Sequence, residues 1–147
     1  SKAKDYIEGL NLLSSMRLCS NVPGQSIIQT ALGGYQSVNE LLIPGGRVYD
    51  QREYIYNALS DIPGVTVKKP KAAFYIFPKL DIKKFNIHDD EQFALDLLKS
   101  KKMLIVQGTA FNWKDPDHFR IVYLPNLKAL EDATNRLSDF LASYHQE

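Results

Sequence analysis

A single arginine interrupts the most strand-like segment of this chain. The segment runs His-Phe-Arg-Ile-Val-Tyr-Leu-Pro, from residue 118 to residue 125. Because side chains alternate between the two faces of a strand, Arg120 shares a face with the apolar Val122 and Leu124. A cation on an apolar face needs a partner, since a buried, unpaired charge is very unfavourable. The fold must therefore bring an anionic group to Arg120.

Two kinds of partner would satisfy Arg120. An Asp or Glu of the same domain would make an internal ion pair, and on the pattern alone this is the more common role for such an arginine. The other possibility is an anionic small molecule, because the planar guanidinium fits a carboxylate or phosphate through two parallel hydrogen bonds. The strand pattern leaves both possibilities open.

Length and composition favour one soluble domain. With 147 residues, 44% of them hydrophobic, the chain can bury one good core. The net charge is +1 without a basic block or stripe, which argues against nucleic acid as a partner. No apolar run approaches the ~20 residues that a membrane helix needs, and the first residues do not resemble a signal peptide. We therefore expect a cytoplasmic protein with no membrane partner.

Neither the single cysteine nor the one acidic cluster indicates a reactive site. Cys19 cannot form an internal disulfide, which fits a reducing compartment. Its neighbours supply no base, so we expect a buried, inert thiol. The acidic residues 89–91 follow His88, but Asp89 and Gln92 form a capping-box pattern, which explains the cluster as a helix start. No metal site is expected.

Hydrophobic periodicity predicts helices that alternate with pairs of short strands. Helices are expected at residues 4–18, 23–35, 47–60, 127–144 and from residue 89 onward. Strands are expected at residues 65–67, 73–77, 103–106 and 119–124, the first two as a hairpin-like pair. This order predicts an α+β fold, a two-layer small domain with a mainly antiparallel or mixed sheet of about four strands packed with helices. A doubly wound nucleotide-binding fold is not expected, because its glycine-rich motifs are missing.

Three segments and the Arg120 strand resemble a known family. The segments are residues 16–23 (MRLCSNVP), 70–78 (PKAAFYIFP) and 106–113 (VQGTAFNW), followed by residues 118–121 (HFRI). In this order and spacing they resemble the C-terminal part of fold-type-I, pyridoxal-phosphate (PLP)-dependent aminotransferases of the class I/II group, in particular the bacterial glutamate–pyruvate (alanine) subgroup. The resemblance implies an interdomain helix and connection at residues 1–22. It implies the small C-terminal domain at residues 23–147, without the large PLP-binding domain.

The resemblance assigns roles to two residues. In that family the arginine of the Phe-Arg-Ile strand binds the α-carboxylate of the amino-acid substrate, and Arg120 matches it. This favours the ligand interpretation of Arg120. The loop at residues 108–113 would lie close to the substrate, with Phe111 as an apolar wall. As an alternative, Phe111 and Trp113 pack against their own domain.

The resemblance also implies what this chain lacks. The Schiff-base lysine of the family, the acid that pairs with the pyridinium nitrogen and the phosphate cradle all lie upstream. No Gly-x-Arg-x-Gly-type run follows Ser1-Lys2, so we interpret Lys2 as an exposed surface lysine. PLP is therefore expected in the full-length enzyme, whereas this chain alone is expected to bind no cofactor, to contain no catalytic residue and to be inactive.

The partners implied by the resemblance are substrates and the rest of the enzyme. The substrates would be an amino acid and a 2-oxo acid, namely alanine or glutamate and pyruvate or 2-oxoglutarate. The full-length enzyme would be a homodimer, and residues Tyr6, Ile7, Leu10 and Leu13 would pack on the missing large domain. Two alternatives remain. One is a non-catalytic, aminotransferase-like effector-binding domain of a regulator, and the other is a stand-alone α+β domain with an internal Arg–carboxylate pair.

Overall fold

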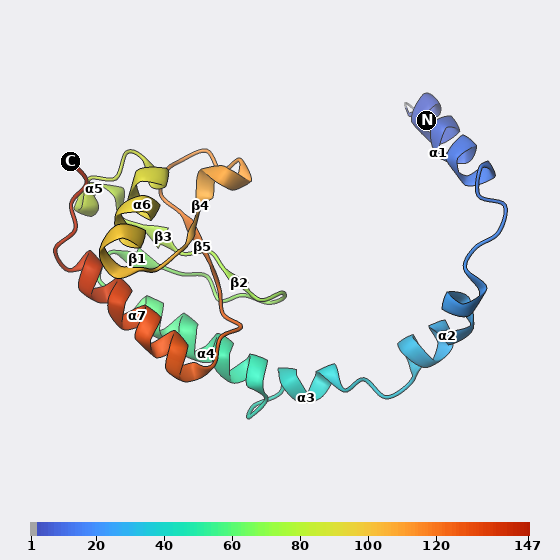
Figure 1. The fold of residues 1–147 in the computed structure, drawn as a ribbon, viewed down its shortest axis with the longest axis horizontal. Helices are drawn as coiled ribbons and strands as arrows, with labels where there is room; N and C mark the ends of the chain where they lie inside the picture. The colour runs from blue at the N-terminus through green and yellow to red at the C-terminus, as the bar shows by residue number, and fades with distance from the viewer. Residues whose placement is uncertain (1–2) are drawn as a thin grey trace. The chain divides into compact units, whose positions relative to one another are not determined.

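The computed structural model describes residues 3–147, which fall into two compact units (Figure 1). The first unit ends at Asn39 and the second comprises Glu40–Glu147. Lys2, interpreted from the sequence as a surface lysine, lies outside the described residues. Within residues 3–147, no helix is both long enough and apolar enough to cross a bilayer.

The N-terminal unit consists of helices with no buried residue. Its helices are α1 (Lys4–Ser15) and α2 (Val22–Gly33), and the short α3 (Val38–Leu42) begins at its end. The side chain of Asn21 caps α2 by accepting a hydrogen bond of 2.9 Å from the backbone N–H of Gly24. Apolar side chains of α1, such as Leu13, are exposed within this unit.

The prediction of a buried cysteine is wrong. Cys19 is exposed, because the connection between α1 and α2 packs against no core of its own unit. The sequence argument assumed one core for the whole chain, and the first 39 residues contribute nothing to the core cluster of buried side chains.

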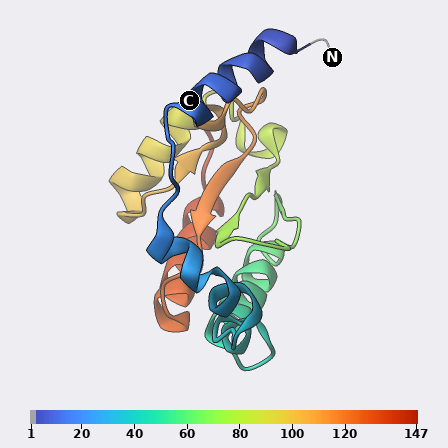
Figure 2. The same ribbon diagram turned by 90° about the vertical axis from the view of Figure 1, so that its right-hand side faces the viewer.

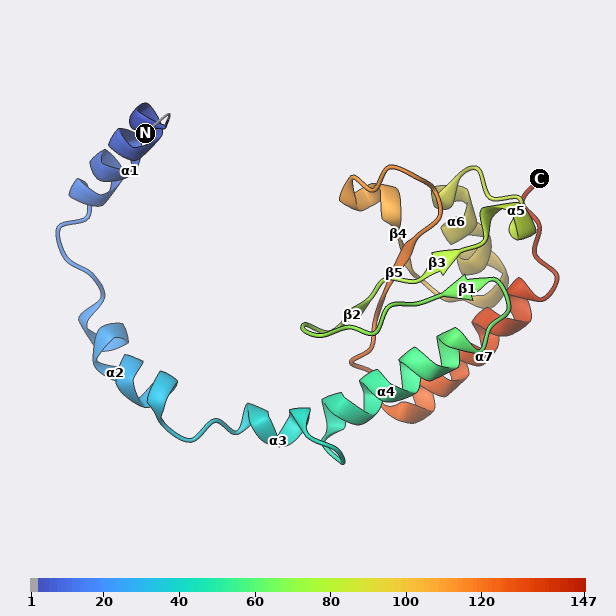
Figure 3. The ribbon, with the colours of Figure 1, turned by 180° about the vertical axis from the view of Figure 1, so that it is seen from behind.

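The C-terminal unit has one layer of helices and one layer of strands. The main helices are α4 (Arg47–Ser60), α6 (Asp90–Lys101) and α7 (Leu127–Leu141), and α4 and α7 lie side by side along the strands (Figures 1 and 3). The apolar spacing in α4 and α7 works as predicted, since Ile55, Leu59 and Leu137 are almost fully buried. The predicted α+β class is confirmed.

The strands are shorter than predicted and form two antiparallel sheets. One sheet pairs β1 (Val65–Thr66) with β3 (Lys79–Leu80), and the other has the order β2-β5-β4. In the second sheet, β5 (Phe119–Val122) lies between β2 (Tyr75–Ile76) and β4 (Val106–Gln107), as Figure 2 shows for β2 and β5. A bridge between Lys79 and His118 joins the two sheets.

The predicted hairpin between residues 65–67 and 73–77 does not form. β1 pairs with β3, and β2 pairs with β5 in the register Tyr75 to Val122. Ala73 adopts a left-handed φ of 59°, which breaks the extended chain just before β2, and Pro78 separates β2 from β3. The predicted strand at residues 103–106 is also mostly wrong. Lys102 ends α6 in the left-handed region, and β4 begins only at Val106.

At the start of α6, only one of the two hydrogen-bonding partners of the predicted capping box, Asp89, plays its expected role. The Asp89 carboxylate accepts hydrogen bonds from the backbone N–H groups of Glu91 and Gln92, as an N-cap should. The Gln92 side chain, however, donates to Asp96, and the buried Gln146 takes its place by accepting from the Asp89 N–H at 2.9 Å. Asp89 of the acidic cluster thus caps the start of α6. A short helix, α5 (Ile82–Phe85), precedes it.

Candidate functional site

Arg120 lies on the open face of β5. The buried Phe119 and Tyr123 and the half-buried Ile121 face the helices, whereas Arg120 and Val122 face the other way. Val122 is 40% exposed, and its partner across the β2–β5 ladder, Tyr75, is 46% exposed. The apolar face that Arg120 shares is therefore a surface of the C-terminal unit. It is not the core.

Two aromatic rings flank the guanidinium of Arg120. Its central carbon lies 4.6 Å from the centroid of the Tyr75 ring and 4.3 Å from that of Phe111, over the face of each ring. Tyr75 comes from β2, on one side of β5. Phe111 comes from the 3₁₀ helix η1 (Gly108–Phe111), which directly follows β4 on the other side. The structure thus brings together the two residues that the sequence had singled out, Arg120 and Phe111.

No acidic residue neutralises Arg120 within the described chain. The ion pairs among residues 3–147 involve other cations, and the buried Nε of Arg120 has no hydrogen-bond partner. An unpaired buried donor is costly and calls for a reason. The internal ion pair considered from the sequence therefore has no candidate partner in residues 3–147.

Asp90 fixes the η1 loop that carries Phe111. This carboxylate is buried and accepts hydrogen bonds from the backbone N–H of Thr109, at 2.9 Å, and from its hydroxyl, at 2.7 Å. On the other side of the loop, the N–H of Gly108 donates to the His118 carbonyl oxygen at 2.8 Å. A Cβ at Gly108 would lie 2.8 Å from that same oxygen, so only glycine fits.

A second cluster of polar contacts, around Asp117, anchors the end of the loop. The Asp117 carboxylate is almost fully buried and accepts hydrogen bonds from Trp113 Nε1 at 2.9 Å and from the His118 ring, and it pairs with Lys79 at 3.2 Å. Burial by itself would raise the pKa of Asp117. The hydrogen bonds from His118, Trp113 and Lys79 outweigh burial and lower the pKa below its ordinary value.

The aromatic surface continues from Arg120 into a cavity. Phe77 contacts Phe111 edge-on, with 6.4 Å between ring centroids, and stacks on His118 at 4.8 Å, while Trp113 lies 4.5 Å from His118. A cavity of about 720 Å³ opens beside these rings, and Tyr75 lines it as well. Three lysines also line it, namely Lys68, Lys69 and Lys79.

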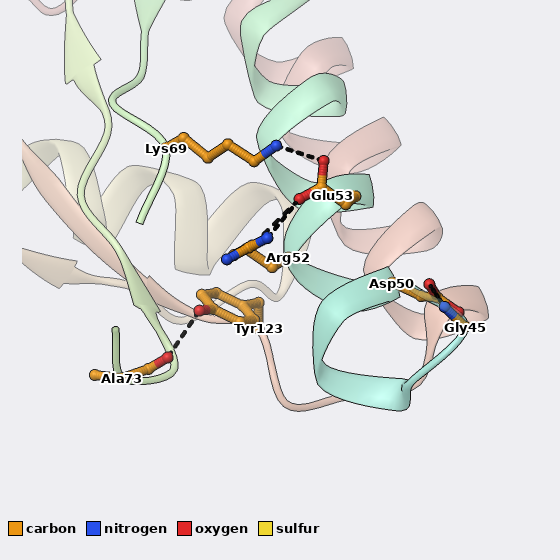
Figure 4. Close-up of polar contacts among 7 residues, drawn as sticks. All are labelled: Gly45, Asp50, Arg52, Glu53, Lys69, Ala73 and Tyr123. Carbon is orange, nitrogen blue, oxygen red and sulfur yellow. Dashed lines mark hydrogen bonds and ion pairs between the residues drawn. The ribbon is translucent and has the colours of Figure 1, made fainter. Parts of the chain in front are cut away.

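Two of the three cavity lysines, Lys69 and Lys79, form ion pairs with carboxylates. Lys69 pairs with Glu53 of α4, which also pairs with the neighbouring Arg52 (Figure 4). The hydrogen bond from Lys69 is the main cause that lowers the pKa of Glu53. Lys79 is paired with Asp117. No group of three potential metal ligands occurs among the described residues.

Tyr123 supports the turn that leads into β2. Its hydroxyl donates a hydrogen bond of 2.8 Å to the carbonyl oxygen of Ala73 (Figure 4). Its backbone N–H donates to the carbonyl oxygen of Phe74 at 3.1 Å. Both bonds fix the chain immediately before Tyr75. Tyr123 therefore helps to place the ring that lies over Arg120.

Sequence reasoning missed four residues of this arrangement: Tyr75, Asp90, Asp117 and Tyr123. Tyr75 could have been found only from the β2–β5 pairing, which the predicted hairpin excluded. Asp90 and Asp117 resemble ordinary surface acids in the sequence, and only burial distinguishes them. Tyr123 has a readable signal, because in a strand it alternates with Arg120 and so faces the core.

Known aminotransferases match this chain over nearly its whole length. Glutamate-pyruvate aminotransferase AlaA of Haemophilus influenzae is 58% identical over 144 residues, 98% of the chain. The crystal structure of an aminotransferase from Escherichia coli, 56% identical, covers 100% of the chain with a TM-score of 0.86. The chain matches the C-terminal region of AlaA, and the similar solved structures are aminotransferases. The alanine aminotransferase of Pyrococcus furiosus, 34% identical, also covers 97% of it with a TM-score of 0.77. The resemblance seen in the sequence is confirmed.

These aminotransferases are much longer than the chain. The chain spans 36% of the Haemophilus influenzae protein, 36% of the Escherichia coli structure and 35% of the Pyrococcus furiosus structure. It therefore represents about a third of each aminotransferase. No family model matches the chain.

Proposed function

We propose that this chain is the substrate-carboxylate-binding part of a PLP-dependent aminotransferase. The reaction would exchange an amino group between alanine or glutamate and a 2-oxo acid, pyruvate or 2-oxoglutarate. One observation carries the proposal: the guanidinium of Arg120 lies on an exposed apolar face, with no carboxylate of residues 3–147 paired to it. The names of the matching proteins support the type of reaction.

One arginine can serve both halves of such an exchange. An amino acid and a 2-oxo acid share the α-carboxylate and differ only at the neighbouring carbon. Two charge-assisted hydrogen bonds from Arg120 to that carboxylate hold the reacting carbon in the same place in either direction. Phe111 lies against the guanidinium and is 43% exposed, so it offers the substrate an apolar wall.

The two ion-paired lysines near the site do not fit the role of the cofactor's lysine. Near the site, Lys69 is paired with Glu53 and Lys79 with Asp117. An ammonium group engaged in an ion pair is not available as a nucleophile, which must be a neutral amine. We therefore assign PLP, which supplies the electron sink for amino-group transfer, to the rest of the enzyme. No step through the cofactor is assigned to residues of this chain.

The remainder of the enzyme is the proposed partner of the N-terminal unit. Helices α1 and α2 expose many large apolar side chains within their own unit, among them Tyr6, Ile7, Leu10 and Leu13. We propose that these side chains pack on the large domain of the full-length protein. We also propose that this protein is cytoplasmic and homodimeric, and that the chain alone is inactive.

Steady-state kinetics of Arg120→Lys in the full-length enzyme test the carboxylate role. Lysine keeps the charge but loses the bidentate geometry, a loss of about 2–4 kcal/mol, or tens- to hundreds-fold in KM. Arg136→Lys is the matched control, because Arg136 is a half-exposed arginine of α7 paired with Asp132. An unchanged KM for Arg120→Lys would remove this residue from the site.

The expected inactivity of the chain alone has a separate test. The 147-residue chain is mixed with PLP, and imine absorbance is followed before and after borohydride reduction. We expect no single lysine to be trapped. One stoichiometrically modified lysine would show that this chain holds the cofactor itself.

A further inference from the structure

The orientation of Arg120 is set by rings and not by an acid. Arginine guanidinium groups are commonly fixed by a neighbouring carboxylate, which also neutralises them. Here the guanidinium lies over the faces of Tyr75 and Phe111, at 4.6 Å and 4.3 Å from the ring centroids. Cation–π attraction to two rings holds a cation in place but leaves its charge uncompensated. An acidic ligand can therefore bind Arg120 without displacing an internal carboxylate.

Burial leaves only the terminal end of the guanidinium accessible. The Nε atom is buried and has no hydrogen-bond partner, and Arg120 as a whole is half-buried. The solvent-accessible donors are therefore the two terminal nitrogens. The guanidinium carbon lies over the face of each ring, so a ligand reaches the group through these terminal nitrogens. This is the approach that gives two parallel hydrogen bonds to a carboxylate.

Each ring is itself fixed by contacts within the C-terminal unit. Tyr75 is held in β2 by its pairing with β5, and Tyr123 ties down the two residues before it through the Ala73 and Phe74 carbonyl oxygens. Phe111 ends the η1 turn, which the buried Asp90 carboxylate holds through both hydrogen bonds of Thr109. Both rings are more than 40% exposed, so core packing does not explain their positions.

We propose that Tyr75 and Phe111 are positioning residues that hold the guanidinium of Arg120 edge-on to the substrate carboxylate. They act through Arg120: they fix the plane in which its terminal nitrogens donate. This inference rests on the proposed function and adds to it the residues that orient the carboxylate-binding group.

The test measures kcat and KM of ring variants of the full-length enzyme for both the amino acid and the 2-oxo acid. Phe111→Leu and Tyr75→Leu each remove one cation–π contact, and each should raise KM by about 3- to 30-fold while kcat changes by less than about threefold. Tyr75→Phe restores the ring and should bring KM back to within about threefold of the wild type. Phe74→Leu is the matched control, since Phe74 is a similarly exposed neighbour without a ring contact to Arg120.

A double variant separates positioning from direct contact with the substrate. In an Arg120→Leu background there is no guanidinium to orient, so adding Phe111→Leu should raise KM clearly less than it does in the wild type, by the loss of the apolar wall alone. If Phe111→Leu raises KM equally with and without Arg120, Phe111 acts only as a wall and the positioning role is wrong. If Arg120→Leu raises KM but neither ring variant does, the positioning role fails and the proposed function stands. If Arg120→Leu itself leaves KM unchanged, both fall together.

Discussion

The hydroxyl of Tyr123 donates a hydrogen bond of 2.8 Å to the carbonyl oxygen of Ala73, a residue with a left-handed φ of 59° (Figure 4). Tyr123 directly follows β5 and is buried, and its hydroxyl contacts the turn before β2. A left-handed alanine is strained by roughly 1–2 kcal/mol. The buried phenol thus holds a strained turn in place, two residues before the ring that flanks Arg120.

Replacing Ala73 by glycine should relieve this strain. Glycine adopts a positive φ freely but loses more chain entropy on folding, which offsets part of the gain. We expect Ala73→Gly to raise the free energy of unfolding by about 0.5 kcal/mol. The control, Ala72→Gly, has no positive φ to relieve and should lower it by about 0.4–1 kcal/mol. Urea unfolding curves measure both, and equal effects of the two changes would argue against strain at Ala73.

Asp117 should make stability depend on acid pH. The hydrogen bonds to its buried carboxylate lower the pKa below the unfolded value of about 3.9. The contribution to stability is therefore complete above about pH 4 and is lost as the pH falls through the folded-state pKa. Asp117→Asn should cost about 2–3 kcal/mol at pH 7 and flatten the fall in stability below pH 4. Asp115→Asn, an exposed neighbour, is the control and should retain the wild-type profile.

Tyr144 should make stability depend on alkaline pH. Burial, together with its hydrogen bond of 3.0 Å to the Asp96 carboxylate, raises the pKa of Tyr144 far above its ordinary value of 10. The folded chain then keeps a proton that the unfolded chain loses, so stability falls as the pH rises above about 10. The slope is up to about 1.4 kcal/mol per pH unit for one group.

Unfolding at pH 8, 10 and 11 measures this slope for Tyr144→Phe. The variant should lose less stability between pH 10 and pH 11 than the wild type. Tyr6→Phe, at an exposed position of α1, should behave like the wild type. A Tyr144→Phe protein with an unchanged slope would show that the phenol ionises equally in both states.

The helices of the C-terminal unit could be predicted because their signals are local. In α4 and α7 the apolar positions recur at steps of three and four, and Leu59 and Leu137 are fully buried as that spacing requires. The strands could not be paired in the same way, since pairing joins residues far apart in sequence. β2 pairs with β5 and not with the nearby β1, and no short-range pattern distinguishes the two.

The sequence allowed Arg120 and Phe111 to be predicted as site residues, but not the neighbour that the fold brings to them, Tyr75. Arg120 stands out because a cation in an apolar strand is rare, and Phe111 because a large aromatic in a polar loop is rare. Tyr75 carries no such signal, and its position over Arg120 follows only from the register of β2 and β5. The exposure of Cys19 was mispredicted because burial was inferred from its neighbours in sequence, whereas the N-terminal unit around it has no buried residue.

A comparison of two substrates tests the role of Arg120 most directly. Alaninamide differs from alanine in lacking the carboxylate, so the ratio of kcat/KM for the two reports the contact with that group. The full-length wild-type enzyme should prefer alanine by about 30- to 1,000-fold, the value of two charge-assisted hydrogen bonds. In Arg120→Leu the preference should fall to within about threefold. A variant that keeps the full wild-type preference would show that another residue binds the carboxylate.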